Sequence, residues 1–201
     1  MGILIENLDW MMPEINNTMS MLELGNQYLY ISCKPYESFP DKFVDPSGYG
    51  KISAKKYFQE LGYDHTSIDL NGQDDALNID LSTAFNLNKQ FDITTDYGTS
   101  EHVKSLYNCL LNIHNHTKPG GKIFHVNPLT NNWPDHGYWY RDEEFYFKYI
   151  ELTGYKINSI KTFPACRNII DGYNIWCFLE KTPESIFPNE DDFNKLPIKL
   201  K

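Results

Sequence analysis

Short apolar runs that alternate with helical segments constrain this chain more than any other feature of its sequence. Strand-like runs lie at 18–24, 66–70, 76–81, 91–95 and 122–126, and two more follow at 155–163 and 173–180. Segments with helical periodicity lie between them, at 51–61, 100–116 and 142–153. Strands that alternate with helices are typical of a mostly parallel sheet with helices on both faces. The sequence therefore predicts an α/β fold of this kind, closed by an antiparallel C-terminal strand pair.

The length of 201 residues favours a single domain with additions. We assign residues 1–181 to this domain and residues 182–201 to a proline-containing, acidic tail that lies on the surface or loose in solvent. Prolines and glycines also fill Tyr30–Gly50, which predicts a loop and a candidate lid. Between Asp69 and Ala76 a helical crossover has no room, so either the crossover is a loop or 76–81 is not a full strand of the sheet.

The charge and the cysteines exclude several classes of partner. The net charge is −9 and the isoelectric point is near 5.1, whereas nucleic acids and anionic membranes need a basic face. The four cysteines form no CxxC pair, so we expect reduced thiols in a cytoplasmic protein. We see no basic and apolar leader, and no apolar stretch approaches the ~18 residues of a membrane-spanning helix. We therefore expect neither nucleic acid nor membrane as a partner.

Acidic residues end three successive predicted strands. The first strand runs into Glu23-Leu24-Gly25-Asn26-Gln27, the second ends in Asp69 and the third in Asp80. Each acid alone is most simply a solvated side chain, but the three together favour an adenosine-type ligand at the sheet edge where such folds bind ligands. A dinucleotide in its usual mode is disfavoured, because only one glycine is present and the next helical segment begins at Lys51.

The stretch FDITTDYGTSEHV, residues 91–103, joins the fourth predicted strand to a helix. Ser100 is the candidate N-cap of that helix, and Glu101 falls in its first turn. We expect the turn before it to present four side chains or backbone groups to a bound cofactor and acceptor: Asp96, Gly98, Thr99 and His102.

The motifs LELG, IDL, NIDL, FDITTDYGTSEHV and KPGGKIFHV, in this order, resemble those of a class I S-adenosylmethionine-dependent methyltransferase. The resemblance covers residues 18–180 and is strongest to small methyltransferase-like proteins with a GTSEHV-type loop. It implies a Rossmann-like fold, S-adenosylmethionine as the cofactor, and a small-molecule or sugar-type acceptor. Two features depart from the family pattern: Asn26-Gln27 stands where a second glycine is usual, and the proline loop delays the helix after the first strand.

The resemblance also implies a cofactor site. Glu23 and Gly25 are expected beside the methionine part and Asp69 at the ribose. Asp80 and Leu81 are expected to flank the adenine, and the stretch from Thr95 to Gly98 to line the sulfonium end. The full set of expected cofactor-binding residues is Glu23, Gly25, Asn26, Gln27, Asp69, Leu70, Asp80, Leu81, Thr95, Tyr97 and Gly98.

Histidines after the fourth and fifth strands are the candidates for chemistry. Methyl transfer from a sulfonium needs mainly alignment and desolvation, and a base helps only when the acceptor must lose a proton. We assign this role to His102, His125 and His136, which the topology brings to one sheet edge. A metal site formed by these histidines and Glu101 is the weakest interpretation, because no i, i+4 pair such as HExxH is present, and we predict none.

The loop NNWPDHGYWY, residues 131–140, carries His136 among four aromatic side chains. These aromatics either wall a pocket for a small acceptor or sugar, or belong to the core, and both interpretations have equal weight. For the whole chain, methyl transfer is the leading hypothesis. A catalytically inactive methyltransferase-like binding or scaffold protein is the alternative, and a dinucleotide-dependent oxidoreductase is disfavoured by the single glycine.

Overall fold

The computed structural model describes residues 2–30, 51–165 and 172–200. Most of the proline-rich stretch Tyr30–Gly50, together with Cys33 and Cys166, lies outside these ranges, so the loop and lid predicted there stay predictions. Cys109 and Cys177 are free and buried. In the part of the chain that the structure describes, no helix has the length and apolar character needed to cross a membrane.

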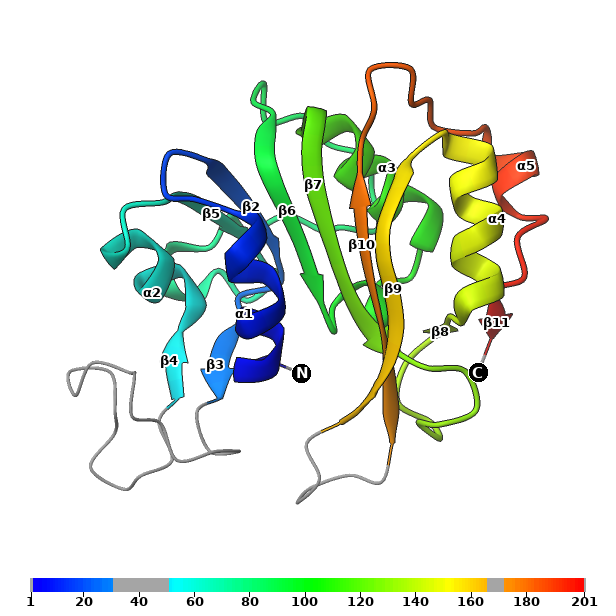
Figure 1. The fold of residues 1–201 in the computed structure, drawn as a ribbon, viewed down its shortest axis with the longest axis horizontal. Helices are drawn as coiled ribbons and strands as arrows, with labels where there is room; N and C mark the ends of the chain where they lie inside the picture. Colours follow the sequence, from blue (N-terminus) through cyan, green and yellow to red (C-terminus); the bar gives the residue numbers. More distant parts are fainter. Residues whose placement is uncertain (1, 31–50, 166–171, 201) are drawn as a thin grey trace.

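A central sheet organises the molecule, with the strand order β5-β2-β6-β7-β10-β9 (Figure 1). Its strands are β2 (Ser20–Leu24), β5 (Asp64–Ile68), β6 (Phe91–Tyr97), β7 (Thr117–Pro128), β9 (Lys156–Pro164) and β10 (Tyr173–Glu180). β5, β2, β6 and β7 are parallel, whereas β10 is antiparallel to both β7 and β9. The predicted α/β fold with an antiparallel C-terminal strand pair is therefore confirmed.

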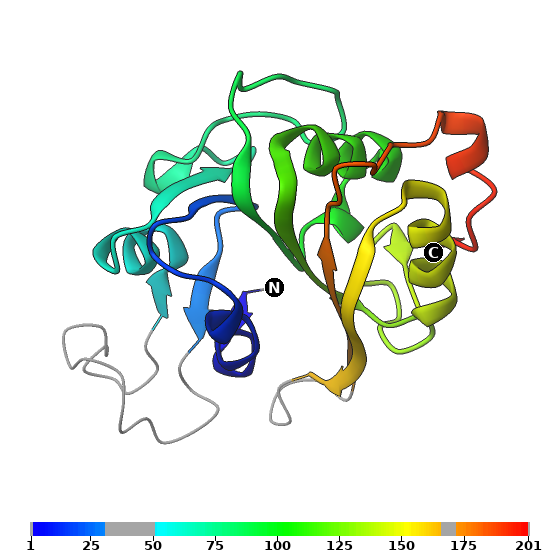
Figure 2. The same cartoon turned by 45° about the horizontal axis from the view of Figure 1, so that its top comes forward.

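Helices cover both faces of this sheet (Figures 1 and 2). Helices α1 (Ile5–Met11) and α2 (Ala54–Glu60) pack on one face, and α3 (Leu106–His116), α4 (Glu143–Thr153) and α5 (Glu190–Phe193) pack on the other. Strand β10 shows why both faces are apolar. Ile175 and Cys177 enter the core beneath α3 and α4, while Trp176 and Phe178 enter the core beneath α1 and α2.

The helix after β6 begins later than the sequence predicts. Ser100–His102 forms a separate 3₁₀ turn, η4, and α3 begins at Leu106. Ser105, not Ser100, is its N-cap, because the Ser105 side chain accepts a hydrogen bond from the Asn108 N–H at 3.2 Å. The prediction that Ser100 and Glu101 start this helix is therefore wrong. By contrast, α4 begins and ends as predicted, with Asp142 as N-cap and Gly154 in a left-handed conformation after it.

The segment after β5 corrects a second expectation. The 3₁₀ turn η3 (Gln73–Asp75) follows Gly72, and residues 76–81 form no strand. Only one isolated bridge, between Ile68 and Leu77, connects this segment to the sheet. The predicted strand Ala76–Leu81 is wrong, and β5 is an edge strand. The physical reason is the short connection between Asp69 and Ala76, because so few residues cannot form the crossover that a parallel strand needs.

A small second sheet, β1-β3-β4, takes two of its strands from the connection between β2 and α2 and one from the start of the chain. It consists of β1 (Ile3–Leu4), β3 (Tyr28–Tyr30) and β4 (Lys51–Ser53), and the 3₁₀ turn η1 (Met12–Glu14) follows α1. Although α2 starts late in the sequence, the Ala54 N–H donates to the Gln27 carbonyl at 3.0 Å. The chain thus returns to the end of β2 before the helix begins.

The last described residues pack on the domain. Phe193 of α5 is buried, with its ring 5.4 Å from the ring of Tyr107. Strand β11 (Lys199–Leu200) pairs with β8 (Trp139–Tyr140) in antiparallel fashion. The segment 182–200 is therefore attached to the surface and not loose in solvent, and the boundary at residue 181 stays a prediction.

Candidate active site

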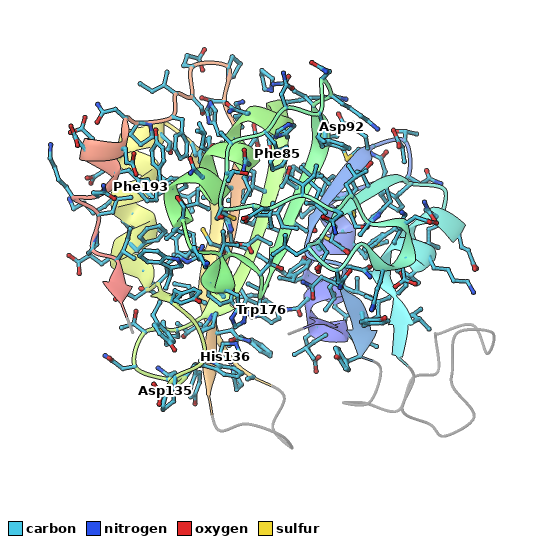
Figure 3. All side chains as sticks on the ribbon, turned by 180° about the vertical axis from the view of Figure 1, so that it is seen from behind. Phe85, Asp92, Asp135, His136, Trp176 and Phe193 are labelled. Carbon is cyan, nitrogen blue, oxygen red and sulfur yellow. The ribbon has the colours of Figure 1, made fainter. Side chains whose placement is uncertain are left out.

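A cavity of about 440 Å³ lies at the carboxyl ends of β2, β5 and β6. Asp92, near the start of β6, and His136, beyond the end of β7, mark opposite ends of the sheet in Figure 3. This is the edge where open α/β sheets bind their ligands, because neighbouring loops diverge there. The volume is within the range of ligand pockets, about 300–1,000 Å³. Its lining comes from four loops, those after β2, β5 and β6 and the segment at residues 79–82, with Tyr138 at the rim.

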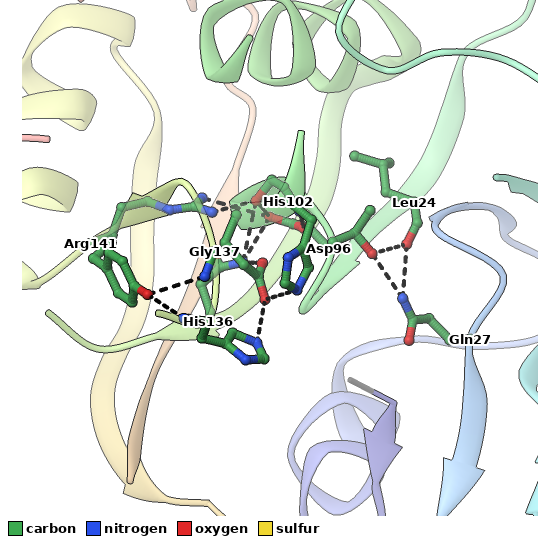
Figure 4. Close-up of polar contacts among 12 residues, drawn as sticks. Leu24, Gln27, Asp96, His102, His136, Gly137 and Arg141 are labelled. Atoms are coloured by element: carbon green, nitrogen blue, oxygen red, sulfur yellow. Dashed lines mark hydrogen bonds and ion pairs between the residues drawn. The ribbon is translucent and has the colours of Figure 1, made fainter. Parts of the chain in front are cut away.

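The turn after β2 forms one wall of this cavity. Gly25 has a φ of +78°, which glycine adopts without strain. Gln27 Nε2 donates to Thr99 Oγ1 at 2.8 Å, and Thr99 Oγ1 donates to the Leu24 carbonyl at 2.8 Å, so two side chains crowd beside Gly25 (Figure 4). On its other side, the Asn26 N–H donates to Asp69 Oδ2 at 2.8 Å. The turn is therefore fixed by bonds from both neighbouring loops.

Most of the expected cofactor-binding residues line the cavity. They are Gly25, Asn26, Gln27, Asp69, Leu70, Asp80, Leu81 and Gly98. The exposed Asp80 accepts hydrogen bonds from the Ser82 hydroxyl and N–H, and these bonds lower its pKa. Lining a cavity does not itself establish a ligand, so the cofactor role of these residues stays a prediction.

Three of the expected cofactor-binding residues lie away from the cavity lining. Glu23 is buried, where it accepts a hydrogen bond from the Gln27 N–H at 2.9 Å and lies 3.4 Å from His65 Nε2. Thr95 is buried inside the sheet, and Tyr97 is buried in the core beneath α1, where its hydroxyl donates to Met11 Sδ at 3.2 Å. Strand alternation explains the difference, because these side chains point into the core layers and not past the strand ends.

The three candidate histidines occupy different environments. His102 lines the cavity and its side chain is 45% exposed. His136 is next to it, with ring centroids 4.8 Å apart, and Figure 4 shows the two side chains converging. His125 is buried within β7 and its Nδ1 lies 2.9 Å from Asp96 Oδ2, so it does not reach the cavity. Burial lowers the pKa of His102 and of His125, and a neighbouring carboxylate opposes the shift in each.

A buried carboxylate lies between the two accessible histidines. Glu101 is fully buried in η4, and its Oε1 lies 3.7 Å from His102 Nε2 and 3.8 Å from His136 Nε2. Its other oxygen, Oε2, accepts a hydrogen bond from Asn127 Nδ2 at 3.3 Å. Glu101 is therefore not in the first turn of the helix, as the sequence predicted, but at the centre of a cluster with His102 and His136.

The loop that carries His136 is docked directly on η4. The Tyr138 N–H donates to the Glu101 carbonyl at 2.7 Å, and the Tyr140 hydroxyl accepts from the His136 N–H at 2.8 Å. A Cβ at Gly137 would lie 2.8 Å from the Glu101 carbonyl oxygen, so only glycine permits this approach. Within the aromatic loop, Trp133 and Tyr140 are buried as core residues, whereas Tyr138 lines the cavity. That this loop walls a pocket for an acceptor stays a prediction.

Beneath this cluster, Asp96 organises a buried polar network. Its Oδ1 accepts from the Ser100 N–H at 2.9 Å, and its Oδ2 accepts from the Ser100 hydroxyl at 2.5 Å and from Asn127 Nδ2 at 3.2 Å. Arg141, also fully buried, places Nη1 3.7 Å from Asp96 Oδ2 and donates to the Ser100 hydroxyl oxygen. Asp96 thus fixes η4 through Ser100. The sequence predicted that Asp96 faces the cavity, but it does not line it.

The charge state of Asp96 follows from these neighbours. Burial alone would raise the pKa of its carboxyl group, but the hydrogen bond from His125 and the charge of Arg141 hold that pKa well below its usual range. Asn127 connects this network to the cluster above it, because the same amide group reaches both Asp96 and Glu101. Neither Asn127 nor Arg141 carries a local sequence signal, since their partners lie far away along the chain.

Comparison with solved structures identifies the architecture. TehB from Haemophilus influenzae aligns with a TM-score of 0.60 and 14% sequence identity over 90% of this chain and 63% of TehB. The fold is that of the class I methyltransferases. The chain spans less than two thirds of TehB, and at this identity the likeness concerns the methyltransferase fold alone. No protein-family model matches the chain, and no curated protein matches it.

Two further structures with the methyltransferase fold contain S-adenosylhomocysteine. The 1,6-didemethyltoxoflavin-N1-methyltransferase of Burkholderia thailandensis aligns with a TM-score of 0.54 and 15% identity over 82% of this chain and 71% of that enzyme. The N-methyltransferase NodS of Bradyrhizobium japonicum WM9 aligns with a TM-score of 0.54 and 11% identity over 88% of this chain and 84% of NodS.

Proposed function

We propose that this protein binds S-adenosylmethionine and transfers its methyl group to a small-molecule or sugar-type acceptor. The observation that carries the proposal is the cavity at the carboxyl edge of β2, β5 and β6, which Asp69, Asp80 and His102 all line. The S-adenosylhomocysteine bound to two proteins of the same fold supports the choice of ligand.

The residues of the cavity suit the adenosyl part of this cofactor. Asp69 accepts one backbone hydrogen bond on each oxygen, from Asn26 and Asn71 at 2.8 Å. Each carboxylate oxygen has a second acceptor site, so Asp69 can still receive both hydroxyls of a ribose. Ile79 and Leu81 line the same cavity near Asp80 and offer apolar contact to a purine ring. A volume of about 440 Å³ is sufficient for a ligand of this class.

S-adenosylmethionine would supply an electrophilic methyl group, so the protein need only align the acceptor and exclude water. We assign the acceptor end of the cavity to His102 and Tyr138, which line it at the end of β6, whereas Asp69 follows β5 on the other side of β2. His136 is close enough to His102 to contact an acceptor that reaches past the rim. His125 is too buried for a catalytic role, and we assign it a structural role through its bond to Asp96.

The alternative is a methyltransferase-like binding or scaffold protein without catalysis. One observation favours this alternative. The Gln27 side-chain amide donates to Thr99 Oγ1 next to Gly25, so these two side chains occupy space where the methionine part of the cofactor is expected. An oxidoreductase that uses a dinucleotide is less suited to the site, since β3 and not a helix follows the glycine turn directly.

Calorimetric titration with S-adenosylmethionine and S-adenosylhomocysteine tests the proposal, with NAD as the control ligand. We expect micromolar binding of the adenosyl ligands, weakened at least tenfold, about 1.4 kcal/mol, in Asp69→Ala. Asp9→Ala is the matched control, because Asp9 is an exposed acid on α1 away from the cavity. A folded protein that binds neither adenosyl ligand would refute the proposal. Binding without S-adenosylhomocysteine formation across an acceptor screen would favour the scaffold alternative.

A further inference from the structure

Glu101, His102 and His136 bring three metal-ligating side chains to one point. Glu101 Oε1 and one ring nitrogen of each histidine all lie within 4.8 Å of one another. The first two residues belong to η4 after β6, and the third belongs to the loop after β7, which Gly137 and Tyr138 dock onto η4. The cluster is thus built from two segments that are held together by backbone contacts, and it does not depend on a sequence-local motif.

The distances from Glu101 Oε1 to the two histidine nitrogens are close to those in a coordination shell, and the two nitrogens lie within 4.8 Å of each other. Ligand atoms that each lie about 2.1 Å from a tetrahedral metal ion are about 3.4 Å apart. Glu101 Oε1 lies 3.7 Å from His102 Nε2 and 3.8 Å from His136 Nε2, a few tenths of an ångström wider. The half-exposed His102 side chain can rotate to close this difference, whereas Glu101 is already fixed.

The unpartnered oxygen of Glu101 points to a ligand. Glu101 Oε1 is fully buried and accepts no hydrogen bond from any described residue, and His136 Nε2 is also buried without a hydrogen-bond partner among them. The distances between Oε1 and the two imidazoles exceed a hydrogen bond, so the histidines do not satisfy it directly. A buried carboxylate oxygen without a partner is costly, and a cation held between the three atoms would remove that cost.

The hydrogen bonds around Glu101 orient its carboxylate in the way that ligands of a metal ion are oriented. Asn127 Nδ2 donates to Oε2 and so turns Oε1 toward the histidines. Asn127 is itself fixed, because its oxygen accepts from the Tyr146 hydroxyl at 2.9 Å and its amide also reaches Asp96. Such outer hydrogen bonds orient metal-ligating carboxylates in proteins. The main chain fixes His136 in the same way, through the bond from its N–H to Tyr140.

We propose that Glu101, His102 and His136 form a binding site for a divalent transition-metal ion such as Zn²⁺, with open positions toward the cavity. Two imidazoles and one carboxylate suit Zn²⁺ or Fe²⁺, whereas Mg²⁺ and Ca²⁺ prefer shells of oxygen. This site departs from the expectation that the sequence supports no metal. The absence of HExxH is not decisive here, since His136 reaches the site from a separate loop.

The position of the site suggests its use. His102 belongs to both the metal cluster and the cavity lining, so a metal ion there would face an acceptor bound in the cavity. A bound metal ion lowers the pKa of a coordinated hydroxyl group and orients it. We therefore assign to the site an acceptor with a metal-coordinating oxygen. This assignment of an acceptor rests on the proposed methyl transfer, but metal binding itself does not.

Titration of the metal-free protein with Zn²⁺, and with Co²⁺ as a spectroscopic probe, tests the site without any adenosyl ligand. We expect binding of one ion at micromolar or lower concentration, visible Co²⁺ absorption bands typical of a low coordination number, and no comparable binding of Mg²⁺. His102→Gln and His136→Gln should each weaken Zn²⁺ binding at least tenfold. His114→Gln is the matched control, because His114 bonds Tyr155 and lies outside the cluster.

Both ligand variants are expected to fold, since the two histidine side chains are 45% and 25% exposed, and urea unfolding checks this. A wild-type protein that binds no Zn²⁺, or binding that stays unchanged in both variants, would overturn the proposal. The experiment contains no S-adenosylmethionine, so its failure leaves the cofactor titration standing, and a failed cofactor titration leaves the metal site standing.

Discussion

Replacing Asp96 by asparagine tests whether the buried network beneath η4 holds the site together. The substitution keeps the shape of the side chain but removes its charge. Both carboxylate oxygens of Asp96 accept hydrogen bonds, so the NH₂ group of asparagine must take the place of one of them. That NH₂ group would then face a donor, either the Ser100 N–H or the donors that bond Oδ2. Arg141, fully buried with its Nη1 3.7 Å away, loses the nearest negative charge.

The expected effect is large for a single isosteric change. Removing one partner of a buried ion pair typically costs about 3–5 kcal/mol, because the other charge stays buried and uncompensated. A small domain has a free energy of unfolding of about 5–15 kcal/mol, so the variant should fold but be much less stable. With a denaturant slope of about 2 kcal/mol per molar urea, the midpoint of unfolding should fall by about 1.5–2.5 M.

Asp64→Asn is the matched control for this measurement. Asp64 makes an ion pair with Lys89 at 2.7 Å, but its side chain is 65% exposed, so the same substitution should cost less than about 1 kcal/mol. If Asp96→Asn lowers the free energy of unfolding by no more than Asp64→Asn, the reasoning about the buried network is refuted.

The pH dependence of the same pair of proteins gives an independent check. The folded-state pKa of Asp96 lies below the ordinary value of a carboxyl group. Its ionised form therefore contributes stability above the unfolded-state pKa of about 3.9, and this contribution is lost as the pH falls from there through the folded-state pKa. The difference in unfolding free energy between wild type and Asp96→Asn should be constant near neutral pH and shrink in acid. A difference that grows in acid would contradict the assignment.

Three further perturbations follow from the structure. Gly137→Ala should lower the free energy of unfolding by about 1–3 kcal/mol, because its Cβ would lie 2.8 Å from the Glu101 carbonyl oxygen; an unchanged urea midpoint would contradict this. Gly25→Ala should lower the free energy of unfolding by a similar amount, about 1–3 kcal/mol, because φ is +78° and the Cβ would lie 2.5 Å from Gln27 Nε2. It should also weaken adenosyl binding. Unaltered stability and affinity would argue against a rigid turn. Burial, followed by the charge of Lys181, lowers the pKa of His114 to about 4. The neutral ring therefore contributes stability above about pH 6.5 that is lost as the pH falls toward about 4, and an NMR titration midpoint above 6 would exclude this.

The sequence predicted the sheet because its strands have local signals. β2 and β10 send apolar side chains into the cores on both faces, as is typical of buried strands in a covered sheet, and Gly154 ends α4 where a left-handed residue is needed. The predictions failed where two local signals were equivalent. Ser100 and Ser105 both precede an amphipathic run. The Asp96 side chain, four residues before Ser100, bonds Ser100 within η4, and Ser105 caps the helix instead.

The candidate site was predicted in outline and not in detail. Residues that follow strand ends, such as Asp69 and Gly98, line the cavity, because a strand end fixes their position. Glu23 and Tyr97 were not, because alternation within a strand sends their side chains into the core. From the sequence, a metal site of Glu101 with the histidines is the weakest interpretation, because no local motif joins them. His136 reaches Glu101 through a loop whose path depends on Gly137 and Tyr140, and no periodicity encodes such a path.

The pairing of β11 with β8 has a consequence for the use of this protein in experiments. β8 follows the loop of His136 without a break, and its Tyr140 hydroxyl holds the main chain at that histidine. Residues 199–200 therefore help to hold the loop of His136 in place through their backbone pairing with β8. A tag or fusion joined after residue 201 would sit next to this strand pair and could disturb it. Loss of activity in such a preparation would therefore first indicate an effect of the tag on the site, and only a tag placed elsewhere would test the chemistry.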